Sequence, residues 1–380
     1  IPGTASRIPV NYKRLPETVS KGSLIYLNDG FLQVRVQGVS SDEVRCKVII
    51  GGPLLSNKGL NLPRARISMD PITDKDLDFV DLGLKDGVDT FGTSFIEKAD
   101  DIRKVKEFAR KRGKSICVVA KIERAEAARN IDEILDVADA IMIARGDLGV
   151  QIPIEDVPAV QKKLIRKANL LGRPVITATQ MLESMTENIR PTRAEVTDVA
   201  NAILDGTDAV MLSEETAIGK YPVETVKMMA RIAMSIERQR RAVKWPSDLE
   251  DYFRSGIGRK NVSAEDVVSL NVIEAVRALK VRLILTPTHT GSTPRRISRF
   301  KPDCWILSFS NYDPTYKFLA LSYGVYPFLI ENRVDGWHDV IMKLIKDNRL
   351  AKKGDRVILT EGTSPGQLGD ADSLRIITVS

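Results

Sequence analysis

Apolar and polar residues alternate in three short stretches near the start of the chain, a pattern typical of β-strands. The stretches cover residues 23–27, 31–36 and 44–50. Asn28-Asp29-Gly30 joins the first two, and Asp-Gly between alternating segments is a strong hairpin signal. The pattern therefore predicts a small β domain over residues 1–62.

After residue 62 the pattern changes to apolar runs separated by helix-type periodicity. These runs cover residues 88–95, 116–122, 140–144, 175–178 and 209–212, and their starts lie about 24 to 35 residues apart, the length of a strand-plus-helix unit. Capping-box patterns begin helices at Thr73 and Thr192. Five β/α units over residues 63–237 follow. Periodicity alone does not separate an open doubly wound sheet from a (β/α)8 barrel.

A second α/β region is predicted over residues 238–380. Its strands are expected near residues 282–286, 305–309, 325–330, 356–360 and 374–379, with helices between the first four and a tight Gly-rich loop before the last. Residues 242–261 contain Trp245-Pro246 and Gly256-Ile257-Gly258, which predict an irregular connection between the two α/β regions.

Composition places the chain among ordinary globular proteins of two or three domains. It has 380 residues, 43% of them apolar and 28% charged, which argues against collagen-like, low-complexity and disordered classes. No apolar run reaches the roughly 18 residues of a membrane span, and the start does not read as a signal peptide. The net charge of +7 suits anionic substrates without requiring nucleic acid. Cys46, Cys117 and Cys304 form no CxxC pair, which favours a cytoplasmic location.

Polar side chains gather where two successive predicted strands end. Lys121 and Glu123 are two residues apart and so project to one face of their strand. The next strand runs into Arg145-Gly146-Asp147-Leu148-Gly149, which places a second carboxylate at the neighbouring strand end. Two carboxylates suit a hard divalent cation that keeps waters and takes substrate oxygens. We predict Glu123 and Asp147 as Mg²⁺ ligands; taken singly, the Lys–Glu pair is more often a structural ion pair and the Asp a turn residue.

The two following strands also end in polar residues. Gly146 permits close approach of the backbone to an anion at the start of the next helix. The third strand ends in Thr177 and Thr179, and the fourth in residues 213–216, Ser-Glu-Glu-Thr. Four consecutive polar strand ends favour a barrel, whose active site lies at the carboxyl ends of its strands.

Four ordered motifs resemble those of pyruvate kinase. They are Ala-Lys-Ile-Glu at 120–123, Ala-Arg-Gly-Asp-Leu-Gly at 144–149, Ala-Thr-Gln-Met-Leu-Glu-Ser-Met at 178–185 and Met-Leu-Ser-Glu-Glu-Thr-Ala at 211–217. The resemblance extends from residues 27–30 and 57–63 to the end of the chain. It implies a (β/α)8 TIM barrel, a small β lid domain and a C-terminal α/β domain. The implied reaction transfers a phosphoryl group from phosphoenolpyruvate to ADP, giving pyruvate and ATP.

The resemblance also implies roles for individual residues. Lys121 would neutralise the transferring phosphoryl group and the enolate, and Thr179 would bind the substrate carboxylate and help to route a proton; Lys121 remains an alternative base. The backbone at Ala144, Arg145 and Gly146 would hold substrate oxygens, and Asp147 is also implied on substrate. Further implied positions are Glu123 and Asp147 on Mg²⁺ or Mn²⁺, and Lys58 and Asp29 in the lid on the nucleotide side. The family also implies K⁺ and a homotetramer.

A hydroxyl-rich loop follows the first predicted strand of the C-terminal region. Thr288, Thr290, Gly291, Ser292 and Thr293 could cradle the phosphate of an effector, the role that the resemblance implies for this loop and for residues 362–369. The same pattern is equally typical of a simple helix N-cap.

The chain departs from the family pattern in one large way. The first three barrel strands, which precede the lid in the family, are not matched, so only five of eight strands are predicted, and no residue matches the Arg and most K⁺ ligands that they bring. Ile1 in place of Met suggests a piece of a longer protein. Two alternatives remain: a truncated, non-catalytic chain for effector binding or assembly, and a Mg²⁺-dependent barrel lyase acting on an enolpyruvate-like substrate.

Overall fold

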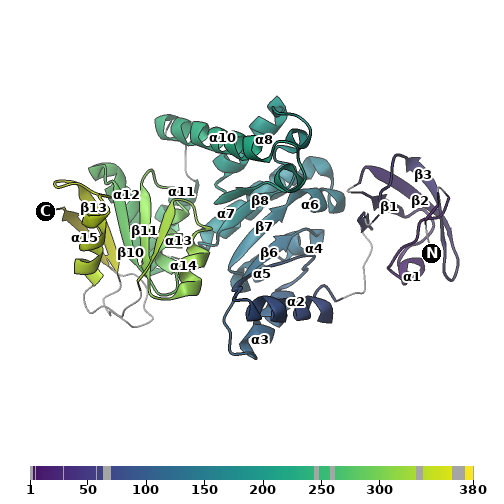
Figure 1. Ribbon diagram of the computed structural model, residues 1–380, viewed down its shortest axis with the longest axis horizontal. Helices are drawn as coiled ribbons and strands as arrows, with labels where there is room; N and C mark the ends of the chain where they lie inside the picture. Colours follow the sequence, from purple (N-terminus) through teal and green to yellow (C-terminus); the bar gives the residue numbers. More distant parts are fainter. Residues whose placement is uncertain are drawn as a thin grey trace.

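The chain forms three sheets that follow one another in sequence (Figure 1). The computed structural model describes residues 3–4, 6–28, 30–56, 58–62, 70–243, 248–256, 262–330, 337–361 and 373–379. Within these residues the first sheet has four strands and the other two have five each.

The first sheet is antiparallel and has the order β3-β2-β1-β4. Leu27 of β1 pairs with Leu32 of β2, so the hairpin predicted around residues 28–30 is present. Buried Ile25, Val36 and Leu62 form part of a small core of its own. The elements of this lid domain are α1 (Leu15–Thr18), β1 (Leu24–Leu27), β2 (Leu32–Val39), β3 (Val44–Ile50) and β4 (Leu60–Asn61).

The second sheet contains five parallel strands in sequential order, β5-β6-β7-β8-β9. Each strand lies beside the next in the chain, which is the strand order of a (β/α) barrel and not of a doubly wound sheet. Within the described residues β5 and β9 each pair on one side only, so the strands form an arc of a barrel. The strands are β5 (Thr90–Thr93), β6 (Cys117–Ile122), β7 (Ala140–Ala144), β8 (Val175–Ala178) and β9 (Ala209–Met211).

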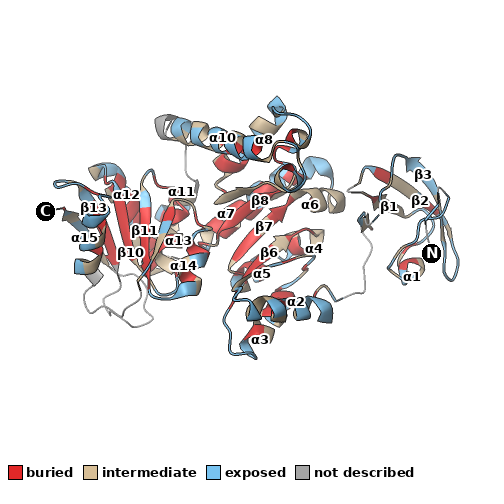
Figure 2. Ribbon diagram, in the orientation of Figure 1, coloured by how far each residue is buried: buried red, intermediate tan, exposed pale blue. Residues whose placement is uncertain are grey.

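Helices cover the outer face of this arc (Figure 2). Val118, Ala120 and Ile122 of β6 point into that outer core, whereas Val119 packs into a separate cluster on the inner face. Residues of β6 therefore alternate between two buried faces. The helices are α2 (Asp74–Lys85), α3 (Ala99–Arg110), α4 (Ala125–Arg129), α5 (Ile131–Val137), α6 (Arg145–Gln151), α7 (Val157–Leu170), α8 (Arg193–Asp205), α9 (Glu214–Ala217) and α10 (Pro222–Val243), with 3₁₀ turns at Ile154–Asp156 and Glu183–Thr186.

The third sheet has the order β12-β11-β10-β13-β14, and its last strand is antiparallel to β13. Buried cores lie on both of its faces, one under α12 and α13 and one under α15. The elements are α12 (Ala264–Leu279), β10 (Leu283–Pro287), α13 (Ser292–Ser298), β11 (Trp305–Ser310), α14 (Asp313–Leu319), β12 (Val325–Leu329), α15 (Trp337–Asp347), β13 (Arg356–Glu361) and β14 (Ser373–Thr378). These strands follow the predicted ones within two residues.

The predicted irregular connection over residues 242–261 is only partly correct. Helix α10 extends to Val243, and a further helix, α11 (Asp248–Gly256), lies inside the connection. Phe253 of α11 is buried in the core of the C-terminal domain and packs edge-on against Phe300. Trp245-Pro246 and Gly256 are typical of loops, so the sequence predicts no helix between them. The tertiary contact of Phe253 stabilises this amphipathic stretch as a helix.

The cap of helix α8 gives a first testable expectation. Thr192 accepts a hydrogen bond from the Glu195 N–H at 3.2 Å, and Glu195 accepts one from the Thr192 N–H at 2.7 Å. Thr192→Ala should therefore lower the free energy of unfolding by about 1 kcal/mol. Denaturant unfolding followed by circular dichroism measures this change.

Thr197→Ala on the same helix is the matched control. Thr197 is exposed and bonds only to the Arg193 carbonyl, and alanine is the better helix former at such a position. An equal loss of stability in both variants would show that the cap contributes nothing specific.

Candidate active site

Lys121 and Glu123 form an ion pair at the carboxyl end of β6. Lys121 Nζ lies 2.5 Å from Glu123 Oε1, and the Glu123 side chain is 1% exposed. Lys121 also donates to Ser94 Oγ at 2.8 Å, and the Phe95 N–H donates to Glu123 Oε2 at 2.7 Å. The two side chains thus share one wall of the arc, as their spacing predicts. The Glu123 carboxylate is thus bound by the Lys121 ammonium and by a backbone N–H group.

The residues that follow β5 were not predicted to be part of the site. Phe95 has a positive φ of 56°, an unfavourable backbone conformation for an aromatic residue. This conformation accompanies the hydrogen bond from its N–H to the Glu123 carboxylate. Backbone strain that places one group at a strand end is common at functional sites. The Ser94 hydroxyl directly after β5 was the available sequence signal.

Helix α6 begins directly after β7, so that Asp147 lies in its first turn. The Arg145 side chain, in contrast, is engaged by neighbouring parts of the fold. Its guanidinium is 10% exposed and donates to Asp198 Oδ1 at 2.6 Å and to the Thr179 carbonyl at 2.8 Å. The side chain therefore fixes the ends of β7 and β8 against helix α8. Contact of the Arg145 backbone with substrate, which the resemblance implies, stays a prediction.

Thr179 links the ends of β7 and β8. Its Oγ1 accepts from the Gly146 N–H at 2.8 Å and donates to the Ala178 carbonyl at 2.7 Å. Thr179 and Gln180 both have positive φ, 68° and 54°. The Gly146 N–H, expected to bind a substrate oxygen, is bonded to this hydroxyl in the structure. Substrate would have to replace the hydroxyl to reach it.

Glu215 fixes the segment that follows β9. Its carboxylate accepts from the Leu182 N–H at 3.1 Å and from the Ser213 N–H at 2.7 Å, and the residue is 2% exposed. Glu215 therefore joins the loops after β8 and β9. Its role in the structure is to shape the site.

The donor set fits a divalent cation that depends on substrate and water. Within the described residues, no group of three or more His, Cys, Asp or Glu side chains could hold a metal ion. Glu123 and Asp147 would therefore supply only part of a metal's coordination shell. Mg²⁺ commonly binds through one or two carboxylates together with substrate oxygens and several waters.

The lid residues can be placed only in part. Asp29 lies outside the described residues, and Lys58 is exposed. The Asn28 N–H donates to the Gly59 carbonyl at 3.1 Å, which brings the two lid segments together. A Cβ built at Gly30 would lie 3.7 Å from Val150, so the hairpin turn lies beside helix α6.

In the C-terminal loop, two hydroxyls bond to the backbone of the loop itself. Thr288 Oγ1 accepts from the Gly291 N–H at 2.9 Å, and Thr290 Oγ1 accepts from the Ser292 N–H at 3.3 Å. Ser292 and Thr293 begin α13. These bonds are those of a helix-start turn, and the predicted phosphate role of the loop stays a prediction. Residues 362–369 lie outside the described residues.

The parallel sheet has barrel strand order and carries acid and lysine side chains at its strand ends, with a β lid and an appended α/β domain. This architecture is that of a barrel enzyme, whose active site lies at the carboxyl ends of the strands. Residues 2–226 match the family model of the pyruvate kinase barrel domain, and residues 266–377 match that of the pyruvate kinase alpha/beta domain. The chain belongs to the pyruvate kinase family, whose members are kinases of glycolysis.

Curated relatives agree over the whole chain. Pyruvate kinase of Thermococcus litoralis is 50% identical over 379 residues, 100% of this chain and 79% of the relative. Pyruvate kinase 2 of Synechocystis is 42% identical over 374 residues, 97% of this chain and 61% of the relative. Pyruvate kinase of Dictyostelium discoideum is 40% identical over 384 residues, 100% of this chain and 75% of the relative.

The structure also bears on membrane association. No helix of the described residues is both long and apolar enough to cross a bilayer.

Proposed function

We propose that the chain supplies the chemical centre of a pyruvate kinase at the carboxyl ends of β6, β7 and β8. The observation that carries this proposal is the buried Glu123 carboxylate with the Lys121 ammonium 2.5 Å away, on the end of a central strand. In the reaction, the bond between phosphorus and the enol oxygen of phosphoenolpyruvate breaks. The phosphoryl group passes to a β-phosphate oxygen of ADP, and the enolate left behind takes up a proton at carbon.

Lys121 is the cation best placed for this charge movement. Its side chain is 27% exposed, so the ammonium can reach a ligand while Ser94 and Glu123 orient it. A fixed cation stabilises negative charge on the moving phosphoryl group and on the enolate oxygen more effectively than water does. Lys121 is therefore assigned to neutralise both.

Glu123 and Asp147 would hold Mg²⁺ or Mn²⁺, which when bound supplies Lewis-acid stabilisation of substrate oxygens. Thr179 would receive the substrate carboxylate, since its hydroxyl lies beside the N–H of Gly146 at the start of α6. A ligand there would exchange with that hydrogen bond. The freed hydroxyl of Thr179 could then pass a proton toward the enolate carbon.

Several finer assignments go with this proposal. Lys58 and Asp29 would close over the nucleotide, and Thr288, Thr290, Gly291, Ser292 and Thr293 would hold the phosphate of an effector. We further propose K⁺ dependence, a homotetramer and a cytoplasmic location. The three cysteines, Cys46, Cys117 and Cys304, are free, in keeping with a reducing compartment.

One assay separates kinase from lyase chemistry. The 380-residue chain is incubated with phosphoenolpyruvate, Mg²⁺ and K⁺, with and without ADP, and pyruvate and ATP are measured separately. We expect both products in equal amounts and only when ADP is present. Phosphoenolpyruvate consumed equally without ADP, to a product other than pyruvate, would favour the lyase, whereas pyruvate and inorganic phosphate formed without ADP would indicate hydrolysis by water and contradict the kinase. Binding of both substrates without turnover would favour the non-catalytic alternative.

A further inference from the structure

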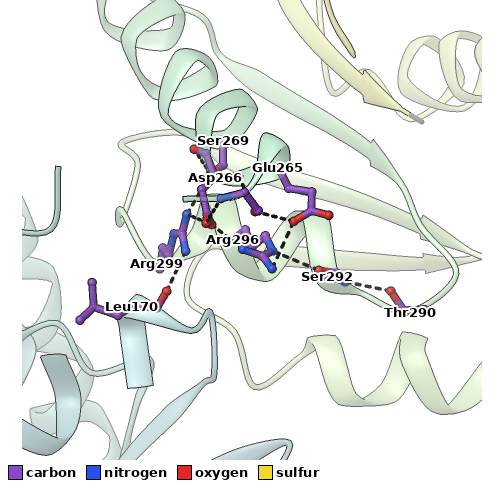
Figure 3. Close-up of polar contacts among 9 residues, drawn as sticks. Leu170, Glu265, Asp266, Ser269, Thr290, Ser292, Arg296 and Arg299 are labelled. Atoms are coloured by element: carbon purple, nitrogen blue, oxygen red, sulfur yellow. Dashed lines mark hydrogen bonds and ion pairs between the residues drawn. The ribbon is translucent and has the colours of Figure 1, made fainter. Parts of the chain in front are cut away.

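The C-terminal domain meets the barrel domain where helix α13 packs on the turn between α7 and β8 (Figure 3). Arg299 Nη1 donates to the Leu170 carbonyl at the end of α7 at 3.0 Å. Gly172 in the turn has a φ of 62°, and a Cβ there would lie 3.3 Å from Arg296 Cγ. Backbone and side chains of the two domains therefore approach closely at this junction.

Four buried polar atoms at this junction have no hydrogen-bond partner. They are the Nε atoms of Arg173, Arg295 and Arg299 and the hydroxyl of Ser322, out of six such side-chain atoms among the described residues. All four residues line the same narrow space. Each unsatisfied buried donor costs on the order of 1–3 kcal/mol, and more where the group is charged. So many orphaned donors in one place indicate a missing acceptor.

Asp208, which lines the same space, and Asp266, which pairs with Arg299, are already engaged. Asp266 accepts from Arg299 Nη2 at 2.8 Å and also pairs with Arg296 (Figure 3). Asp208 accepts from Lys301 at 2.7 Å, from the Tyr323 N–H at 3.0 Å and, through its other oxygen, from the Val175 N–H at 3.0 Å. Neither carboxylate bonds to an orphaned Nε.

The space is also electrostatically unfavourable without an anion. Burial, and next the guanidinium of Arg173, lower the pKa of Arg295 to about 10. Burial lowers the pKa of Arg299 to about 10 as well, although Asp266 opposes this shift. Asp139 attracts Arg295 from a distance, but its Oδ2 is bonded to Lys106 and to the Val118 N–H. Arg295 and Arg299 therefore stay charged at neutral pH. With Arg173 they bring three guanidinium groups to a space whose one lining carboxylate, Asp208, is already engaged.

We propose that Arg173, Arg295, Arg299 and Ser322 bind one small tetrahedral oxyanion, inorganic phosphate or the phosphoryl group of a metabolite, between the barrel and C-terminal domains. Charge-assisted hydrogen bonds from guanidinium to phosphate are strong, and four oxygens can serve all four donors. The site lies at the end of α13 opposite to the Thr288–Thr293 loop, so it is separate from that predicted effector position.

Binding would be coupled to the arrangement of the domains. In the structure the space between the four residues has no room for a water molecule. An oxyanion therefore enters only if α13 moves away from the α7–β8 turn, which breaks the bond from Arg299 to the Leu170 carbonyl. A ligand that binds only the opened junction shifts the population toward it. The bound anion would thus stabilise an arrangement in which α13 lies further from the barrel domain.

Isothermal titration calorimetry with inorganic phosphate at fixed ionic strength tests the site. We expect saturable binding to the 380-residue chain, weakened by about tenfold or more in Arg295→Gln through loss of a charged hydrogen bond. Arg110→Gln removes an exposed arginine at the end of α3 and should bind as the unchanged chain does. Arg295→Gln should also melt at a higher temperature without phosphate, because it removes a buried charge.

Two further measurements distinguish the source of the bound phosphate group and the site at which it binds. Ribose 5-phosphate binding more tightly than inorganic phosphate, and equally sensitive to Arg295→Gln, would identify a metabolite phosphoryl group as the ligand. Thr290→Ala should leave phosphate affinity unchanged. The proposal is overturned if phosphate does not bind, if Arg295→Gln binds it normally, or if only Thr290→Ala loses binding. None of these readouts requires turnover, so they stand apart from the kinase proposal.

Discussion

Lys121→Met should lower the rate of pyruvate and ATP formation by about 10²–10³-fold or more, the loss expected when one preorganised electrostatic group is removed from a transition state. Methionine keeps most of the length of the lysine side chain but carries no charge. The missing ammonium leaves the moving phosphoryl group and the enolate oxygen without their fixed cation. Steady-state assay of both products gives the rate.

The same variant must be shown to be folded. It leaves the buried Glu123 carboxylate with the hydrogen bond from the Phe95 N–H but without its cation, so a loss of stability is expected beside the loss of rate. Lys114→Met is the matched control, because Lys114 is exposed and precedes the same strand at its opposite end. Circular dichroism and Mn²⁺ binding should show a native fold with cation affinity retained. Near-normal turnover in folded Lys121→Met would remove this residue from the mechanism.

The elements that the sequence predicts well are those that local pattern dictates. The strand Ala140–Ala144 is apolar throughout because it is buried on both faces, and its bounds match the prediction. The helix start at Thr192 has its capping box. The side chains of Lys121 and Glu123 meet because alternation on a strand fixes their shared face. Such features depend on neighbours within a few residues.

Other parts of the site depend on contacts between residues far apart in the chain. The partner of Arg145 is Asp198, 53 residues further on. No spacing rule links them, so the structural role of the Arg145 side chain is not predictable from the sequence. The positive φ of Phe95 is equally hidden, because nothing local favours it for an aromatic residue. Packing of the strand ends against each other determines both.

The junction between the domains is the extreme case. Arg173 and Ser322 are about 150 residues apart, yet they line one space. In the sequence, Arg295 and Arg299 are ordinary basic residues one helical turn apart. Only the burial of their Nε atoms distinguishes Arg295 and Arg299 from the exposed basic residues that usually occur at this spacing on a helix.

Glu123→Gln should sharply weaken binding of Mg²⁺ or Mn²⁺ and lower turnover with it. The amide is almost the same size as the carboxylate, but it carries no charge and offers one oxygen in place of two. With Asp147 as the second predicted ligand, loss of one carboxylate removes half of the charged protein donors. We expect the affinity for Mn²⁺ to fall by at least about tenfold. Loss of an outer-shell partner alone causes a fall of about that size or more, and loss of a ligand should cost at least as much. Titration of Mn²⁺ followed by electron paramagnetic resonance measures it.

Glu215→Gln supplies a closely matched control. Glu215 is as deeply buried as Glu123, at 2% against 1% exposed, and it also accepts from backbone N–H groups. It lies just after β9 and is not a predicted ligand. Glu215→Gln should therefore lower the melting temperature while leaving Mn²⁺ affinity unchanged. If both variants lose Mn²⁺ equally, general disorder of the strand ends explains the effect; if neither does, Glu123 is not a ligand and its buried charge serves only to orient Lys121.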